Sequence, residues 1–180
     1  AMTHKKTGIL APAMTGDLET VQKHMEQNIP RLLELAERGL RITAPIPSCV
    51  LMYRQELPLL FPDDARVKKV QAAFTDPFEF LMARHRAGQL RTDFKRGLGK
   101  VAWHAPCHQR VQNIGPKTKD VLELVPETWV TSIERCSGHD GTYAVKAENY
   151  AFARKICAPV AARVNDGEFD HYISDCPMAG

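Results

Sequence analysis

Two stretches of this sequence decide the fold: residues 100–108, KVAWHAPCH, and residues 128–136, TWVTSIERC. Each stretch opens with apolar or β-branched residues, a pattern that is typical of a buried strand. Each then passes into a polar segment that carries a cysteine. The residues between them include a helical pattern over 117–125, so we predict a strand, a helix and a second strand in succession.

The same alternation continues to the end of the chain. A long helix is predicted over 147–164, and a third strand over 172–174. Strands that alternate with helices of this kind predict a parallel sheet with right-handed crossovers. We therefore assign the chain to the α/β class, with a parallel sheet flanked by helices.

The first half of the chain predicts mainly helices. Apolar residues recur at helical spacing over 18–38, where Pro30 predicts a kink or two consecutive helices. A short strand is expected over 40–44. The polar segment 88–99 is the expected boundary between two subdomains. The remaining helices are predicted over 49–61 with Ser48 as the cap, over 63–73, and from the Asp76-Pro77 pair to His85.

Composition excludes several classes of protein. The chain has 180 residues with 44% hydrophobic and 25% charged content, which is ordinary for a globular protein with a core. A net charge of +3 is too small to indicate nucleic-acid binding. The sequence shows neither a secretory signal nor an apolar run of the ~18 residues that a membrane span needs. We expect a cytoplasmic protein that reaches the inner membrane only through partners.

The cysteines carry the chemistry. The chain has five cysteines. An odd number of cysteines in a chain of this length argues against a secreted disulfide framework. Cys157 lies within a predicted helix and is expected to be a core residue. Because parallel strands end at one edge of a sheet, thiols that follow strands are expected to converge there. The four cysteines that follow the end of a predicted strand are Cys49, Cys107, Cys136 and Cys176.

Thiolates at one edge suit an iron–sulfur cluster or zinc. Taken singly, each cysteine is more often a core residue than a ligand, and the chain has no Cys-x-x-Cys pair. His104, His108 and His139 flank the cysteines in the sequence. The roles open to each are metal ligand, donor to sulfur, proton carrier and loop residue hydrogen-bonded to the backbone, and the last is favoured for His108. A catalytic Cys–His pair oriented by Asp140 or Asp175 is a further alternative, without a nucleophile signature.

Three stretches carry a family resemblance. Residues 103–108 read WHAPCH, residues 136–143 read CSGHDGTY, and residues 175–177 read DCP. They resemble, in that order, the HxPCH, CCGxxGTY and CPxC motifs of the cysteine-rich CCG domain family. This family includes heterodisulfide reductase B-type subunits, the C subunit of anaerobic glycerol-3-phosphate dehydrogenase, and iron–sulfur subunits of glycolate and lactate oxidation. Residues 146–150, KAENY, resemble the glycerol-3-phosphate dehydrogenase branch.

The resemblance implies two domain copies, because residues 16–19, GDLE, and 47–49, PSC, resemble parts of a preceding copy. It divides the chain into a tag or linker over 1–15, the C-terminal part of a first copy with connecting helices over 16–90, and a second copy over 97–180 that is truncated at its end.

The sequence departs from the family at three cysteine positions. Ser137, Ala179 and Ile46 stand where the family has cysteines. The five-cysteine non-cubane cluster of the family is therefore not expected. The four strand-end cysteines, with His104 or His139 as rivals for the fourth position, are expected to hold a [4Fe–4S] cluster or, alternatively, zinc.

The resemblance implies a component of an oxidoreductase complex, not a complete enzyme. The leading hypothesis is an iron–sulfur module that passes electrons between a dehydrogenase and a quinone or carrier, with dehydrogenase or membrane-anchored redox subunits as partners. The alternatives are a structural zinc module and a metal site with an open position that binds a small substrate.

Overall fold

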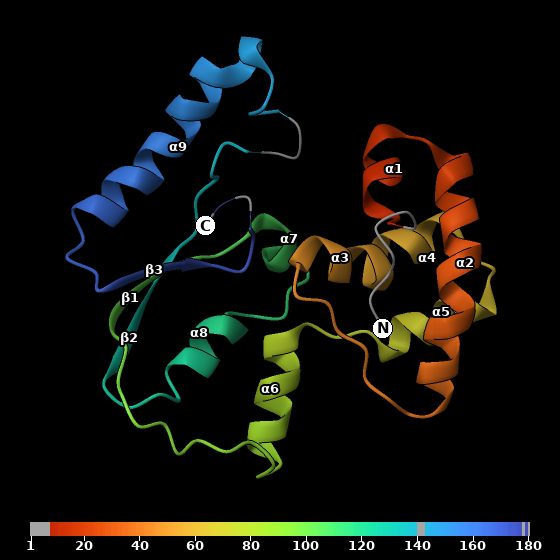
Figure 1. Ribbon diagram of the computed structural model, residues 1–180, viewed down its shortest axis with the longest axis horizontal. Helices are drawn as coiled ribbons and strands as arrows, with labels where there is room; N and C mark the ends of the chain where they lie inside the picture. The colour runs from red at the N-terminus through yellow and green to blue at the C-terminus, as the bar shows by residue number, and fades with distance from the viewer. Residues whose placement is uncertain (1–7, 140–142, 178, 180) are drawn as a thin grey trace. The chain divides into compact units, whose positions relative to one another are not determined.

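The computed structural model describes residues 8–139, 143–177 and 179. The chain divides into two compact units, Ala1–Pro77 (unit 1) and Phe78–Gly180 (unit 2), and each is described by itself (Figure 1). The division comes before the polar segment 88–99, where the sequence predicted a boundary. The assignment of the chain to a linker and two domain copies stays a prediction.

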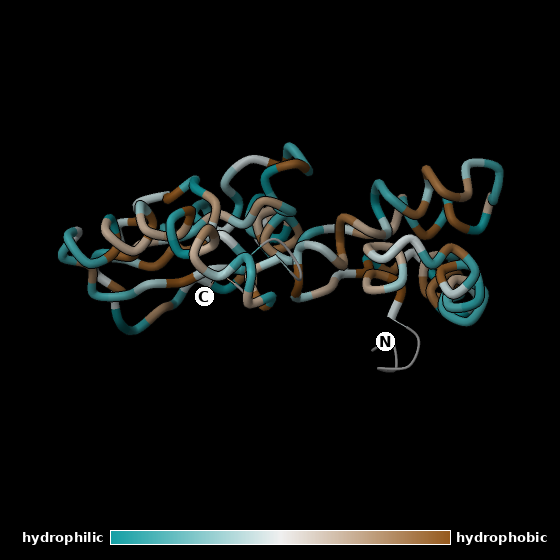
Figure 2. The backbone as a smooth tube through the Cα atoms, turned by 90° about the horizontal axis from the view of Figure 1, so that it is seen from above, coloured by the Kyte–Doolittle hydropathy of each residue, from teal (hydrophilic) through white to brown (hydrophobic). Residues whose placement is uncertain are grey.

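Unit 1 is built from helices around one apolar core. Hydrophobic and hydrophilic residues alternate along these helices, which is the pattern of helices with one buried face (Figure 2). The buried residues of the core include Val21, Ile29, Val50 and Leu57. The helical segments are α1 (Leu10–Thr15), α2 (Leu18–Glu37), α3 (Pro47–Leu51), the π-helical segment η2 (Met52–Glu56), α4 (Leu57–Leu60) and α5 (Ala65–Ala73).

The longest helix of unit 1, α2, confirms the predicted helix over 18–38. The Asp17 side chain accepts a hydrogen bond of 3.0 Å from the Thr20 N–H and so satisfies one of the free donors at the helix start. Pro30 lies inside α2, so the alternative of two consecutive helices is not adopted. The buried residues of α2 follow helical spacing, and its apolar members are Val21, Met25, Ile29 and Leu32.

The helical stretch that carries Cys49 differs in part from the prediction. It begins at Pro47 with Ile46 as the N-cap, so Ser48 lies inside the first turn and does not cap the helix. Pro58 has no N–H to donate to the Arg54 carbonyl oxygen four residues earlier. The Gln71 side chain of α5 donates to that oxygen instead, at 2.7 Å.

The strand predicted over 40–44 is wrong. Among the described residues of this segment, pairing is limited to one isolated parallel bridge between Ile42 and Phe74. The Ile42 N–H donates to Ala73, and its carbonyl oxygen accepts from Thr75. One residue forms both bonds, which is too little for a strand, so Cys49 does not follow a strand end as predicted.

Unit 2 confirms the predicted parallel sheet. Its three strands are β1 (Gly99–His104), β2 (Thr128–Ile133) and β3 (His171–Ser174), in the order β2-β1-β3, and all are parallel. The helical segments that join or precede them are α6 (Pro77–Arg86, starting at the last residue of unit 1), α7 (Cys107–Arg110), α8 (Lys117–Leu122), the 3-10 turn η3 (Ala147–Asn149) and α9 (Tyr150–Asn165).

The sheet of unit 2 is covered on both faces. On one face, buried Val101 and Trp103 pack with Leu122 of α8. On the other face, Ala102 and Ile133 pack with Val160 of α9. Successive residues of β1 thus serve opposite faces, as the pleat of a strand requires, and Figure 1 shows α8 and α9 on opposite sides of the sheet. None of the helices in the described part of the chain is long and apolar enough to cross a bilayer.

Candidate functional site

The C-terminal edge of the sheet gathers three of the predicted cysteines. His104, the last residue of β1, pairs in register with Ile133 of β2 and with Ser174 of β3. Cys107 and Cys136 each follow three residues after this level, and Cys176 follows two residues after it. Neighbouring strands lie about 4.8 Å apart, so three adjacent strands deliver their thiols to one edge, with Cys107 in the middle.

The three thiols differ in their exposure. Cys107 and Cys136 are exposed, and Cys176 is half-buried. The Gly138 N–H donates to the Cys136 sulfur at 3.3 Å. Such a hydrogen bond is one of the contacts by which a protein tunes a bound metal or cluster.

Gly138 also sets the position of the Cys136 loop. Its φ of +76° lies in the left-handed region, which glycine adopts without strain. A Cβ at this position would clash with the carbonyl oxygen of Ala153, a buried residue of α9. The glycine of the CSG motif therefore lets the loop after β2 lie directly against the backbone of α9.

His104 is buried beneath this edge, with 2% of its surface exposed. Its Nε2 lies 2.7 Å from the carbonyl oxygen of Arg135, which only accepts, so Nε2 carries the hydrogen. In the neutral ring Nδ1 then holds a lone pair. This atom is buried and has no hydrogen-bond partner among the described residues. It is therefore a nitrogen donor that the surrounding protein does not satisfy.

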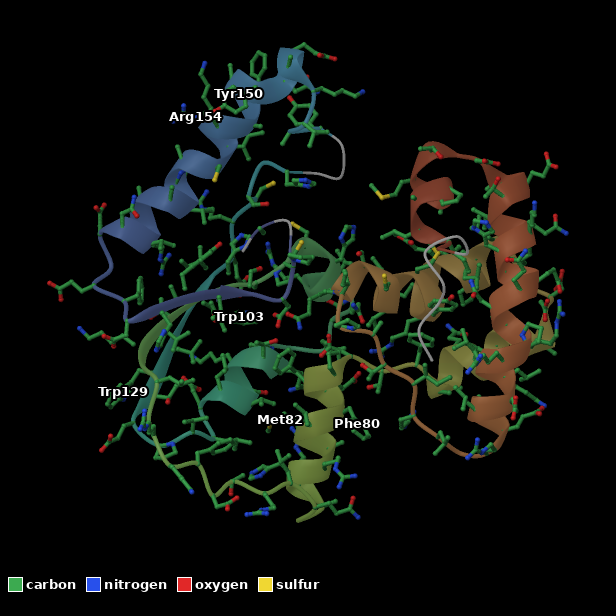
Figure 3. All side chains as sticks on the ribbon, in the orientation of Figure 1. Phe80, Met82, Trp103, Trp129, Tyr150 and Arg154 are labelled. Carbon is green, nitrogen blue, oxygen red and sulfur yellow. The ribbon has the colours of Figure 1, made fainter. Side chains whose placement is uncertain are left out.

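Asp175 has a structural role at the same edge. Its Oδ2 accepts hydrogen bonds of 2.9 Å from Trp103 Nε1 and of 2.9 Å from the Thr118 hydroxyl (Trp103 is labelled in Figure 3). Thr118 is buried and in turn accepts from the Gln109 side chain. Asp175 thus ties the loop that carries Cys176 to β1 and α8. This position does not favour the catalytic alternative in which Asp175 orients a Cys–His pair.

The other polar candidates are less well placed. His139 is half-buried, and its backbone carbonyl accepts from Ala144 at 3.1 Å. His108 is exposed in α7, in keeping with a helix-start role, and its carbonyl accepts from Gln112 at 2.8 Å. Asp140 lies outside the described residues.

Cys49 belongs to unit 1 and has a different environment from the edge cysteines. It is half-buried in α3, and burial raises the pKa of its thiol. A raised pKa keeps the thiol protonated, whereas metal ligation needs the thiolate. Burial, and secondarily the charge of Cys49, raise the pKa of Tyr53, so these two side chains are neighbours in the core of unit 1.

Cys157 is less buried than its place within a predicted helix indicated. It is half-buried in α9 and not fully enclosed in the core. Burial raises the pKa of Tyr172, and the charges of Cys157 and Cys176 raise it further, so both sulfurs are neighbours of this ring. The Tyr172 hydroxyl donates to the Ala179 carbonyl at 2.6 Å. Tyr172 was not among the site residues predicted from the sequence. Its alternation with Ile173 in β3 nevertheless places it on the face of the sheet that α9 covers.

The side chains at the edge do not form a finished metal site. In the described part of the chain, no three histidine, cysteine, aspartate or glutamate side chains are arranged to hold a metal ion. The donor chemistry nevertheless fits: the edge offers three thiols, and a buried imidazole lone pair lies beneath it. The predicted ligand set of Cys49, Cys107, Cys136 and Cys176 stays a prediction.

Comparison with known proteins gives similarity over part of the chain. The chain is 32% identical over 78 residues to the C subunit of the anaerobic glycerol-3-phosphate dehydrogenase of Escherichia coli K12, and equally to its counterpart in Escherichia coli O157:H7. The match covers 43% of this chain and 20% of the relative, so the matched part is about a fifth of the relative's length. No family model and no solved structure matches. The predicted resemblance is thus supported for this dehydrogenase component over part of the chain.

Proposed function

We propose that the chain is an iron–sulfur module of a larger oxidoreductase, where it passes electrons between a dehydrogenase and a quinone or carrier. One observation carries the proposal: the register of β2, β1 and β3 brings Cys136, Cys107 and Cys176 to one edge. The partial similarity to a dehydrogenase component supports a redox role. The proposed partners are a dehydrogenase or a membrane-anchored redox subunit, met at the cytoplasmic side of the membrane.

The proposed ligands are the thiolates of Cys107, Cys136 and Cys176 with one further donor. His104 is the favoured fourth donor because its Nδ1 lone pair is buried and unsatisfied. Cys49 and His139 are its rivals, and the raised pKa of Cys49 counts against that thiol. A bound [4Fe–4S] cluster would supply one-electron transfer, and zinc would supply only structure.

The remaining residues of the edge would hold these ligands in place. The Gly138 N–H donates to the Cys136 sulfur and so helps to hold this side chain in position. The His104 Nε2–H holds the carbonyl of Arg135, the residue before Cys136. Asp175 fixes the loop that carries Cys176 through its hydrogen bonds with Trp103 and Thr118. Trp103 lies on the face of the sheet that α8 covers.

The test is anaerobic purification followed by iron, sulfide and zinc analysis and a visible absorption spectrum. We expect iron and sulfide with broad visible absorption. Cys107→Ser, Cys136→Ser and Cys176→Ser should each remove most of the iron. Cys157→Ser is the matched control and should retain it. Stoichiometric zinc without sulfide would establish the zinc alternative, and full iron retention in all three variants would exclude the edge as the site.

The fourth ligand is tested separately. His104→Ala should lower iron retention, whereas Cys49→Ser should leave it unchanged, since burial raises the pKa of Cys49 and so disfavours the thiolate that a metal needs. His139→Ala should leave both metal content and the absorption spectrum unchanged. Loss of iron in Cys49→Ser together with retention in His104→Ala would assign the fourth position to Cys49.

A further inference from the structure

The helix α9 turns basic and aromatic side chains to solvent. Its sixteen residues include two arginines and one lysine and contain no aspartate or glutamate. Tyr150, Phe152 and Ile156 are 57%, 59% and 44% exposed. Large exposed apolar side chains beside charges of one sign are typical of a surface that binds a partner.

The cations of α9 have no acidic partner of their own. No carboxylate in the described part of the chain lies within ion-pair distance of Arg154, Lys155 or Arg163. The Arg154 guanidinium lies 5.9 Å from the centre of the Tyr150 ring, and Lys155 Nζ lies 5.9 Å from that of Phe152 (Figure 3 labels Tyr150 and Arg154). These contacts leave the positive charges unneutralised.

Several other cations of unit 2 are paired with carboxylates. Arg110 pairs with Glu134 at 3.5 Å, and Lys117 pairs with Asp120 at 3.0 Å. Lys119 pairs with Glu123 at 3.6 Å. Unlike these three cations, Lys155 and Arg163 of α9 have no carboxylate within ion-pair distance among the described residues.

The packing of one side of α9 on the sheet argues against a lipid bilayer as the partner that binds this helix. An amphipathic helix binds a bilayer by burying one continuous apolar face. In α9 that face is already packed on the sheet through Ala153 and Val160. At 100° per residue, Phe152 and Ile156 lie on one flank of the helix and Tyr150 lies on the other. The exposed apolar residues thus form two separate flanks.

We infer that the outward face of α9 binds an acidic segment of a partner protein. The carboxylates of the segment would pair with Lys155 and Arg163, which lie on the same side of α9 as Phe152 and Ile156. The apolar residues of the segment would contact Phe152 and Ile156. Gly138 packs against Ala153 in the same helix, so this partner would lie beside the loop that carries Cys136. The inference goes beyond the proposed electron transfer and needs no bound metal.

The test measures binding of a fluorescein-labelled peptide of ten glutamates and four leucines by fluorescence anisotropy at low and high salt. The variant Lys155→Glu/Arg163→Glu should weaken binding by roughly tenfold or more, because it reverses the charge that attracts the peptide. The matched control Lys95→Glu/Arg96→Glu makes the same change in net charge elsewhere in unit 2. It should weaken binding by about threefold at most.

A second variant isolates the apolar part of the surface. Phe152→Ser/Ile156→Ser should weaken binding about threefold to tenfold while leaving its salt dependence unchanged, because no charge is altered. Circular dichroism of every variant checks that the fold is intact.

Three outcomes would overturn the inference. Equal loss of binding in both charge-reversed variants would show that only net charge matters. If the protein binds no peptide but sediments with phosphatidylglycerol vesicles, and charge reversal on α9 abolishes this sedimentation, the face would be assigned to a membrane. A dimer in size-exclusion chromatography that dissociates in the α9 variant would assign it to a second copy of this chain.

Discussion

The two units of this chain place cysteine in opposite ways. In unit 1, Cys49 lies in a helix, half-buried beside Tyr53, and burial raises its pKa. In unit 2, Cys107 and Cys136 are exposed beyond the ends of the strands, Cys107 at the start of α7 and Cys136 in a loop. A helix that packs along its length encloses its thiol, whereas a parallel sheet delivers the loops after its strands to one open edge. The comparison thus sets a half-buried thiol with a raised pKa in unit 1 against exposed thiols at the sheet edge of unit 2.

The largest expected difference in stability is between two glycine substitutions, one in each unit. Gly138→Ala should lower the free energy of unfolding of unit 2 by about 2–4 kcal/mol, because a left-handed φ and a clash with Ala153 are imposed together. Gly16→Ala in unit 1 has a similar φ but open space around it, and should cost about 1 kcal/mol.

Denaturant unfolding separates the two units in this experiment. The two tryptophans of the chain, Trp103 and Trp129, lie in unit 2, so their fluorescence follows that unit, while far-ultraviolet circular dichroism follows both. Equal losses for the two glycine variants would show that the close approach of Gly138 to α9 contributes nothing.

The next effect compares two aspartates that accept hydrogen bonds. Asp175→Ala leaves two side-chain donors, on Trp103 and Thr118, without their acceptor and should destabilise unit 2 by about 2–3 kcal/mol. Asp17→Ala removes an exposed helix cap in unit 1 and should cost about 1 kcal/mol. Denaturant midpoints measure both. A larger loss for Asp17→Ala would contradict the structural role assigned to Asp175.

The thiols themselves give a smaller contrast. In metal-free protein, Cys107 and Cys136 should react with iodoacetamide at least about tenfold faster than Cys49, which is half-buried and disfavours its thiolate. Burial raises the pKa of Cys49, so its thiolate forms only at higher pH. The rate of alkylation of Cys49 should therefore continue to rise at pH values where the rate of an ordinary exposed cysteine has reached its plateau. Peptide mass spectrometry over time measures each rate, and equal rates at all three sites would remove the contrast between the units.

The smallest effect lies in the helical stretch of unit 1. Gln71→Ala should destabilise that unit by about 1 kcal/mol, because the Arg54 carbonyl loses the donor that compensates for Pro58. Gln71→Met keeps most of the side-chain volume but lacks the donor, so it should cost nearly as much. A neutral Gln71→Met variant, followed by circular dichroism, would show that packing and not the hydrogen bond matters.

Local patterns predicted most elements of the fold. The β-branched run over 128–133 and the helical spacing over 18–37 are strong signals that tertiary contacts reinforce. The failure over 40–44 has the opposite cause. This apolar segment resembles a strand, but in unit 1 it meets helices and bonds chiefly through Ile42, and a strand requires a neighbouring strand along its length.

The candidate site was predictable in its members but not in its surroundings. Cys107, Cys136 and Cys176 were identified because each follows a strand, and the register confirms that they share an edge. The tie from Asp175 to Trp103 spans 72 residues, and the one to Thr118 spans 57. No local pattern encodes such contacts, so these partners came only from the structure.

By itself, the sequence determined the α/β class, the strands of unit 2 and the three cysteines beyond them, because the periodicity of side chains along a segment records which face is buried. Only the tertiary structure decided that Cys49 belongs to a helical core, that Cys157 neighbours Tyr172, and that the Nδ1 atom of His104 is buried without a partner. Burial, thiol pKa and hydrogen-bond satisfaction depend on atoms that are brought together from distant parts of the chain.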